Sequence, residues 1–231
     1  MKRFLKATLI LSFTGLAAPA AQATIIGVSG PDSTAGIALE IISAPSDLLD
    51  DAIAVDGMKG FDEAQGVVTA ADYQMDFGVT LETGTRVDSH MIFLNSVGPT
   101  AVMQYQALWT FDGLILGVMS DRFGLLEFNS TPELGAPGTN YSTSFPGSGP
   151  AAPFEYRGLE RNLGGNGQGD GYAVNGNQIL VDMFVTEPGD WIRVVTASPE
   201  VTTTNAVPAP PMGALLSLGI LALGYVRRRR N

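Results

Sequence analysis

His90 is the only histidine in the chain, and it limits the catalytic chemistry that the sequence can support. One imidazole cannot build a histidine metal cluster, and a serine triad would have a single available base. On a strand, Asp88 and His90 share one face and Ser89 points away, which argues against a local triad. No nucleophile-elbow pattern occurs in the sequence. We therefore expect His90 to be a hydrogen-bonded structural residue.

Carboxyl groups offer a second kind of chemistry, because a glycosidase needs two of them about 5 to 10 Å apart. The chain has 23 Asp and Glu residues, so some pair will meet that distance by chance. Nothing in the sequence distinguishes the candidate acids Asp121, Glu127, Glu155 and Glu160 from solvated surface groups. Secreted glycan hydrolysis is therefore the least favoured of the hypotheses that we carry forward.

The segment 166–171 reads Asn-Gly-Gln-Gly-Asp-Gly and partly imitates a calcium-binding loop. Oxygen-bearing side chains alternate with glycine, and a glycine stands at the sixth position, where the turn of such a loop requires it. The twelfth position is Asn177 instead of a bidentate glutamate, which excludes a high-affinity EF-hand. A weak calcium site using Asp170 and Asn166 and an ordinary glycine-rich turn both remain open. Apart from that calcium ion, we expect no cofactor.

The N-terminal residues 1–23 have the organisation of a secretory signal peptide. Lys2, Arg3 and Lys6 form a basic region, and an apolar stretch follows over residues 7–18. Ala21 and Ala23 flank one glutamine in the small-x-small pattern of a cleavage site. We expect export through the Sec translocon and cleavage after Ala23.

The C-terminal residues have three successive parts. A proline-marked break, Val207-Pro208-Ala209-Pro210-Pro211, precedes an uncharged apolar run over residues 212–226, and Arg227, Arg228, Arg229 and Arg230 follow. The run is shorter than the roughly 20 residues that span a bilayer, but arginine side chains can extend it by reaching the headgroups. We expect a transmembrane helix in the inner membrane, with the basic cluster on the cytoplasmic side.

This tripartite ending resembles the PEP-CTERM sorting signal of Gram-negative bacteria, with Ala209 where the commonest form has glutamate. The resemblance implies recognition and processing by an exosortase-type enzyme. It also implies delivery to the cell surface or the exterior, in systems associated with exopolysaccharide and biofilm. The segments 84–95, 117–121 and 189–194 are similar to exported bodies found on such proteins, a similarity that supplies no activity.

The chain between the two targeting segments is strongly acidic. Seven of the 13 basic residues lie in those segments and none of the 23 acidic ones does, which leaves six basic residues and a net charge of −17. Such a surface repels nucleic acid and favours cations or neutral glycans, although solubility in a salty exterior is the simpler explanation. The chain has no cysteine, so its stability must come from a packed core.

The composition and the alternation of apolar residues predict a mainly β protein with many short strands. We expect an antiparallel two-sheet sandwich of jelly-roll-like form over residues 24–197, a Thr/Pro linker over 198–211 and the sorting helix over 212–231. Asp112-Gly113 predicts a hairpin turn. Tyr105 and Trp109 are expected in the core, and Trp191 is left open. The predicted strands are 25–28, 37–42, 73–81, 87–94, 101–111, 114–119, 178–185 and 191–196, with a helical turn at 46–54 and loops at 133–153 and 164–176.

These features favour a non-enzymatic surface or extracellular-matrix protein with a structural or adhesive role in the envelope or biofilm. The alternative is a carbohydrate-binding module, with or without calcium. The expected partners are the Sec translocon, an exosortase-type enzyme, the inner membrane and an exopolysaccharide.

Overall fold

A computed structural model describes residues 23–48, 53, 55–96, 98, 100–141, 157–160, 169–186 and 189–199. The chain divides into two compact units, residues 1–199 and 200–231, and every described residue belongs to the first. That unit is mainly β, as the sequence predicts, and its described residues form antiparallel and mixed sheets and one α-helix. None of the helices in the described ranges is long and apolar enough to cross a membrane.

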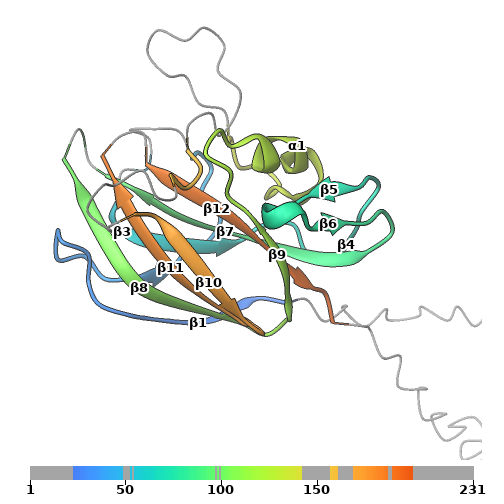
Figure 1. Cartoon of the computed structure of the whole chain (residues 1–231), viewed down its shortest axis with the longest axis horizontal. Helices are drawn as coiled ribbons and strands as arrows, with labels where there is room; N and C mark the ends of the chain where they lie inside the picture. Colours follow the sequence, from blue (N-terminus) through green and yellow to red (C-terminus); the bar gives the residue numbers. More distant parts are fainter. Residues whose placement is uncertain are drawn as a thin grey trace, which may run out of the picture. The chain divides into compact units, whose positions relative to one another are not determined.

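Two large sheets carry most of the described chain (Figure 1). The four-stranded sheet has the order β1-β8-β11-β10 and is antiparallel throughout. The six-stranded sheet has the order β2-β3-β7-β12-β9, with β4 also beside β7, and only its β2–β3 pair is parallel. The first sheet comprises β1 (Ile25–Ser29), β8 (Val102–Phe111), β10 (Gly171–Asn175) and β11 (Gln178–Val185). The second comprises β2 (Glu40–Ile41), β3 (Val55–Asp62), β4 (Val67–Val68), β7 (Arg86–Asn95), β9 (Ile115–Met119) and β12 (Asp190–Ala197).

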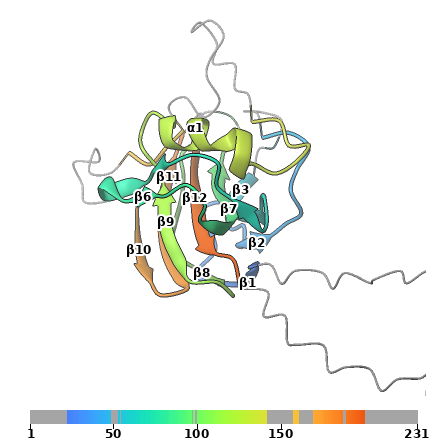
Figure 2. The same ribbon diagram turned by 90° about the vertical axis from the view of Figure 1, so that its right-hand side faces the viewer.

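The six-stranded sheet is buried on both faces. On β7, Ile92 and Leu94 belong to a core shared with the four-stranded sheet, whereas Met91 and Phe93 pack on the opposite face. That outer face is covered by α1 (Leu125–Leu134) and by a small hairpin of β5 (Tyr73–Gln74) and β6 (Thr80–Leu81) (Figure 2). The continuous apolar run of residues 91–94 in β7 follows from this double burial.

The prediction of a single strand over residues 73–81 is wrong. The segment folds back through a 3-10 turn, η1 (Asp76–Gly78), which joins β5 to β6. Phe77 and Gly78 both have positive φ, at 59° and 75°, and this pair of left-handed residues reverses the chain. Alternation of Met75, Phe77 and Val79 therefore does not describe one face of a strand.

Simple alternation along a strand would place Met103, Tyr105, Ala107 and Trp109 on one face, but β8 does not follow it. Gln106 has a φ of 56°, and the pairing of β8 with β11 shifts register beside it. This β-bulge moves the buried face from Val102 and Gln104 to Ala107 and Trp109. Trp109 is in the core as expected, whereas Tyr105 is only half-buried.

Asp112 and Gly113 make a turn, but not the predicted hairpin. The strands on either side, β8 and β9, lie in different sheets. The N–H of Phe111 donates to the carbonyl of Asn177 at 2.9 Å, and the N–H of Ile115 donates to the carbonyl of Gly176 at 3.1 Å. The turn therefore bonds to the β10–β11 connection and carries the chain from one sheet to the other.

Other predicted elements differ in detail. Residues 37–42 contain only the two-residue strand β2, and the predicted loop at 164–176 contains β10. Helix α1 was not predicted and overlaps the start of the predicted loop at 133–153. In the predicted helical turn at 46–54, Asp47 instead forms an isolated bridge with Asn140, and residues 49–52 and 54 lie outside the described ranges. Strands at 25–28, 87–94, 178–185 and 191–196 are confirmed.

Candidate binding groove

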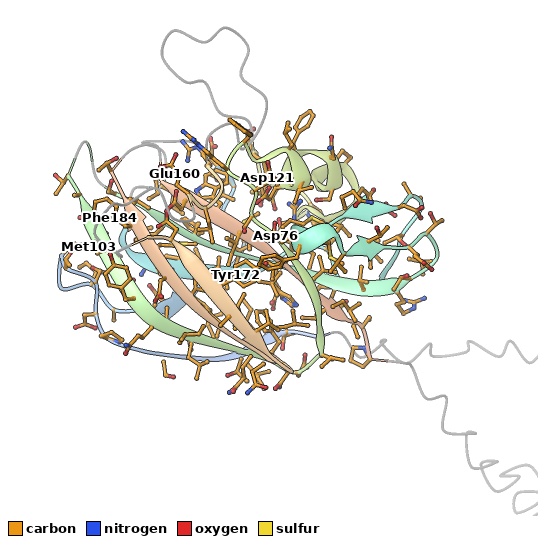
Figure 3. The ribbon with its side chains drawn as sticks, viewed as in Figure 1. Asp76, Met103, Asp121, Glu160, Tyr172 and Phe184 are labelled. Atoms are coloured by element: carbon orange, nitrogen blue, oxygen red, sulfur yellow. The ribbon has the colours of Figure 1, made fainter. Side chains whose placement is uncertain are left out.

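A groove of about 370 Å³ lies between the free edges of the two sheets, where β9 and β10 face η1. Its walls are largely apolar, with Val79, Ile115 and Val174 among the lining side chains. Asp76 and Tyr172 lie next to each other at this edge, on η1 and β10 respectively (Figure 3). A mainly apolar cleft with a few convergent polar groups has the usual composition of a ligand site.

The polar end of the groove is the carboxylate of Asp76. Its Oδ2 accepts hydrogen bonds from the Ser120 hydroxyl at 2.7 Å and from the Tyr172 hydroxyl at 2.8 Å. Its Oδ1 accepts the backbone N–H of Ser120 at 3.3 Å. These bonds join η1, the end of β9 and β10, so the carboxylate fixes the geometry of the groove.

Phe77 forms the exposed aromatic part of the groove. Its side chain is 82% exposed, although its backbone adopts the left-handed conformation with φ 59° and ψ 20°. For a bulky residue that conformation costs about 1–2 kcal/mol. The Phe77 ring packs edge-on against Tyr172, with centroids 6.1 Å apart. An exposed ring held in a strained conformation is typical of a contact surface.

Gly117 allows η1 to approach β9. A Cβ atom at this position would lie 2.4 Å from the sulfur of Met75, the residue before η1. A glycine inside a strand often marks such a close approach. This glycine was the one sequence signal for the groove, because neither Asp76 nor Phe77 stood out from a strand pattern.

The described lining fits binding better than glycoside hydrolysis. Among the described residues that line the groove, Asp76 is the only carboxylate, and a glycosidase needs two. A planar aromatic ring beside hydroxyl and carboxylate groups suits a sugar ring, which has an apolar face and polar edges.

His90 has the structural role expected from the sequence. The ring is fully buried, its Nδ1 lies 2.7 Å from Oδ1 of Asp62, and its Nε2 lies 3.0 Å from the Thr196 hydroxyl. Ser89 points to the opposite face, where its hydroxyl donates to Glu63 at 2.7 Å. The structure thus keeps the only imidazole away from the adjacent serine.

Asp170 is a buried residue at the start of β10. Its Oδ1 accepts the N–H of Phe184 at 2.6 Å, and its Oδ2 accepts the N–H of Glu160 at 3.2 Å. Its carboxyl group is also hydrogen-bonded to that of Asp190, which is 7% exposed. Burial raises the pKa of Asp170, and burial with the neighbouring Asp170 raises the pKa of Asp190 well above its usual range. Burial therefore favours the protonated form of this carboxyl pair over the doubly ionised form.

The calcium prediction for this region remains untested. Within the ranges that the structure covers, no group of three or more His, Cys, Asp or Glu side chains is arranged to hold a metal ion. Asn166, the other predicted ligand, lies outside the described residues. Ala21 lies outside them as well, as do the sorting residues Val207, Pro208, Ala209, Pro210, Arg227, Arg228, Arg229 and Arg230.

A second buried polar cluster lies on the outer face of the six-stranded sheet, beneath α1. Arg193 of β12 binds Glu63 in a bidentate manner, through Nε at 2.7 Å and Nη2 at 2.8 Å, and both side chains are fully buried. The Tyr141 hydroxyl donates to the same carboxylate at 2.6 Å, and Arg193 donates to the carbonyl of Glu127 at 2.8 Å. This network attaches α1 to the sheet.

The Glu127 side chain lies within this buried region. Both of its carboxyl oxygens lack a hydrogen-bond partner among the described residues. Burial raises its pKa well above the usual range, and nearby Asp121 and Asp76 add to the effect. Burial therefore favours the neutral form of Glu127, which the sequence did not distinguish from a solvated surface group.

No protein-family model matches the chain, and neither a curated protein nor a solved structure matches it. The groove and the buried clusters must therefore be interpreted from their own chemistry.

Proposed function

We propose that this chain is an exported, non-enzymatic surface or matrix protein that adheres to polysaccharide through the groove between β9 and β10. The observation that carries the proposal is Phe77, whose backbone is strained and whose exposed ring stands beside the Asp76–Tyr172 pair. Exposed aromatic rings bind the apolar faces of sugars, and fixed polar groups orient the hydroxyls.

The charge of the chain narrows the class of ligand. A net charge of −17 between the predicted targeting segments disfavours anionic polymers and favours neutral or amine-bearing polysaccharides. The export route through Sec, the PEP-CTERM-like tail and an exosortase-type enzyme supports a location at the cell surface or outside it. A biofilm exopolysaccharide is then the partner that the resemblance and the groove both favour.

The finer architecture belongs to the same proposal. We infer an antiparallel two-sheet sandwich of jelly-roll-like form, because consecutive strands alternate between the sheets. Strand β7 lies in the six-stranded sheet, β8 in the four-stranded one and β9 in the six-stranded one again. Such crossings produce two sheets around one core, and they bring the two free edges together at the groove.

Affinity electrophoresis in gels containing a neutral glucan, chitosan or alginate tests the binding proposal. We expect retardation by the glucan or by chitosan, none by alginate, and at least about tenfold weaker binding for Phe77→Ala, equivalent to roughly 1.4 kcal/mol. Phe123→Ala is the matched control, because Phe123 is also exposed but does not line the groove. Equal loss in both variants, or no retardation of the wild-type chain, would reject the proposal.

The non-enzymatic part is tested on the same polymers. Incubation with the wild-type protein should leave the chain length of a bound polysaccharide unchanged, measured by size-exclusion chromatography. Shortening that disappears in Asp76→Asn would show hydrolysis instead.

A further inference from the structure

Three successive backbone N–H groups at the start of the described chain each donate to a different aspartate. The N–H of Ala23 donates to Asp88 at 2.5 Å, and that of Thr24 donates to Asp112 at 2.5 Å. The next N–H, of Ile25, donates to the carboxylate of Asp62 at 3.0 Å. The acceptors come from the end of β3, from β7 and from the turn after β8, so the fold gathers three carboxylates around residues 23–25.

Of the three carboxylates, Asp62 lies 2.7 Å from Nδ1 of His90, whereas Asp88 and Asp112 form no ion pair with a described Lys, Arg or His. Asp88 is fully buried, and its other oxygen accepts only the backbone N–H of Gly66. Arg86, the nearby cation, donates to the carbonyl of Gly66 at 2.8 Å.

A buried carboxylate without a counter-charge is costly, and a positive group bound beside it offsets that cost. The N–H groups that already occupy the cluster belong to the chain at the predicted cleavage site. The positive group that fits these carboxylates is therefore the N-terminal nitrogen of the cleaved chain, which carries a charge that the amide nitrogen of the uncleaved chain lacks.

We propose that Asp112 and Asp88 bind the α-ammonium group of the mature chain, which cleavage after Ala23 creates on Thr24. This inference rests on the export step of the proposed function. Hydrolysis of the Ala23–Thr24 bond consumes one water and leaves a carboxylate on Ala23 and an amine on Thr24. That amine takes up a proton at neutral pH, because an α-amino group has a pKa of about 7.7–8.0.

The new charge on the Thr24 nitrogen lies close to the carboxylates of Asp112 and Asp88. The nitrogen of Thr24 already lies 2.5 Å from Oδ1 of Asp112. Successive backbone nitrogens are less than about 3.8 Å apart, so Oδ2 of Asp88 lies within about 6 Å of the same nitrogen. Removal of Ala23, which is fully buried, opens space toward Asp88 for the ammonium hydrogens.

Burial of Ala23 in the folded domain does not prevent cleavage, because Sec substrates cross the membrane unfolded. Cleavage therefore precedes docking. The precursor has a neutral amide in the cluster and the mature chain has a positive charge there, so maturation itself stabilises the exported fold.

The test compares two forms of the chain 24–231 in mild detergent, one with a free amine on Thr24 and one with that amine acetylated. We expect the free form to melt roughly 2–4 °C higher at pH 6, the shift that a modest ionic stabilisation gives a domain of this size. The difference should vanish at pH 10, where the amine is neutral. Asp112→Asn should abolish the difference at pH 6, whereas Asp32→Asn, at an exposed position, should preserve it.

Two results would overturn the inference. One is equal melting of the free and acetylated forms at pH 6, and the other is a difference that persists at pH 10. Mass spectrometry of the exported protein should also give a chain that begins at Thr24; a start upstream of Ala23 would contradict the proposal. The melting comparison needs neither export nor polysaccharide, so its failure is distinguishable from failure of the proposed function.

Discussion

Glu63, which binds Arg193 of β12, and Asp190, the first residue of β12, are both buried carboxyl groups, yet their surroundings are opposite. Glu63 is held by the guanidinium of Arg193 and by the hydroxyls of Tyr141 and Ser89. Asp190 faces the carboxyl group of Asp170, and its Oδ2 lacks a hydrogen-bond partner among the described residues. Glu63 is thus paired with a cation through direct hydrogen bonds, whereas Asp190 faces a second acid, whose effect on the pKa the positive charge of Arg157 offsets only in part. Because the pKa of Asp190 is raised, its contribution to stability falls as pH rises.

The largest effect is expected from breaking the buried ion pair between Arg193 and Glu63. Arg193→Met should destabilise the domain by about 3–5 kcal/mol, because it leaves Glu63 charged, buried and without its cation. Chemical denaturation at pH 7 measures the change. The control is Arg122→Met, since the Arg122–Glu160 pair is exposed and its loss should cost less than about 1 kcal/mol. Similar losses in both variants would contradict the contrast drawn here.

A smaller effect is expected from removing one donor of the same carboxylate. Tyr141→Phe deletes the hydroxyl that donates to Glu63 and accepts the N–H of Ala136 at 2.7 Å. Leaving those buried groups short of a partner should cost about 1–3 kcal/mol in a denaturation experiment. Arg193 still neutralises the carboxylate, so a loss as large as that of Arg193→Met would show that the hydroxyl, and not the cation, holds Glu63.

The smallest effect is expected at the carboxyl pair of Asp170 and Asp190, and it depends on pH. Because the folded-state pKa of Asp190 is raised, the folded state binds more protons than the unfolded one above about pH 4, and stability falls as pH rises. Asp190→Asn mimics the protonated form. It should match the wild type near pH 4 and melt a few degrees higher at pH 8. Thermal scans across that range measure the difference, and a difference independent of pH would rule out a raised pKa for Asp190.

Glu127 provides an independent check of the same idea. Its raised pKa arises from burial near Asp121 and Asp76, far along the chain from Asp190. Glu127→Gln should therefore also gain stability relative to the wild type as pH rises from 4 to 8. If Glu127→Gln is less stable than the wild type at every pH, the ionised carboxylate of Glu127 is stabilised by a partner, and the neutral form is not the favoured one.

The sequence was sufficient to predict those strands whose apolar residues are fixed by burial in the core. Strand β7 is apolar on both faces, and β11 and β12 are bounded by clear turn residues, so their positions were predictable. The structural role of His90 was predictable because the neighbouring Ser89 lies on the opposite face of the strand, where it cannot form a local triad with the imidazole. The mainly β class followed from composition.

The groove was not predictable, because its parts are set by contacts distant in sequence. Asp76 is bonded to Ser120 and Tyr172, and these bonds turn a segment with strand-like alternation into η1. The bulge at Gln106 similarly depends on pairing with β11. Helix α1 contains Pro132 and begins after a glycine without a side-chain cap, so Glu127 in the first turn is its one usual start signal.

Strand β12 also determines when the domain can fold. It lies between β7 and β9, and those two strands are joined within the sheet only through it. A chain that emerges N-terminus first cannot complete this sheet until residues 190–197 appear, after almost the whole domain has passed. Sheets that depend on such distant pairing form slowly. On the proposed export route, the six-stranded sheet would therefore be completed only after residues 190–197 have crossed the membrane.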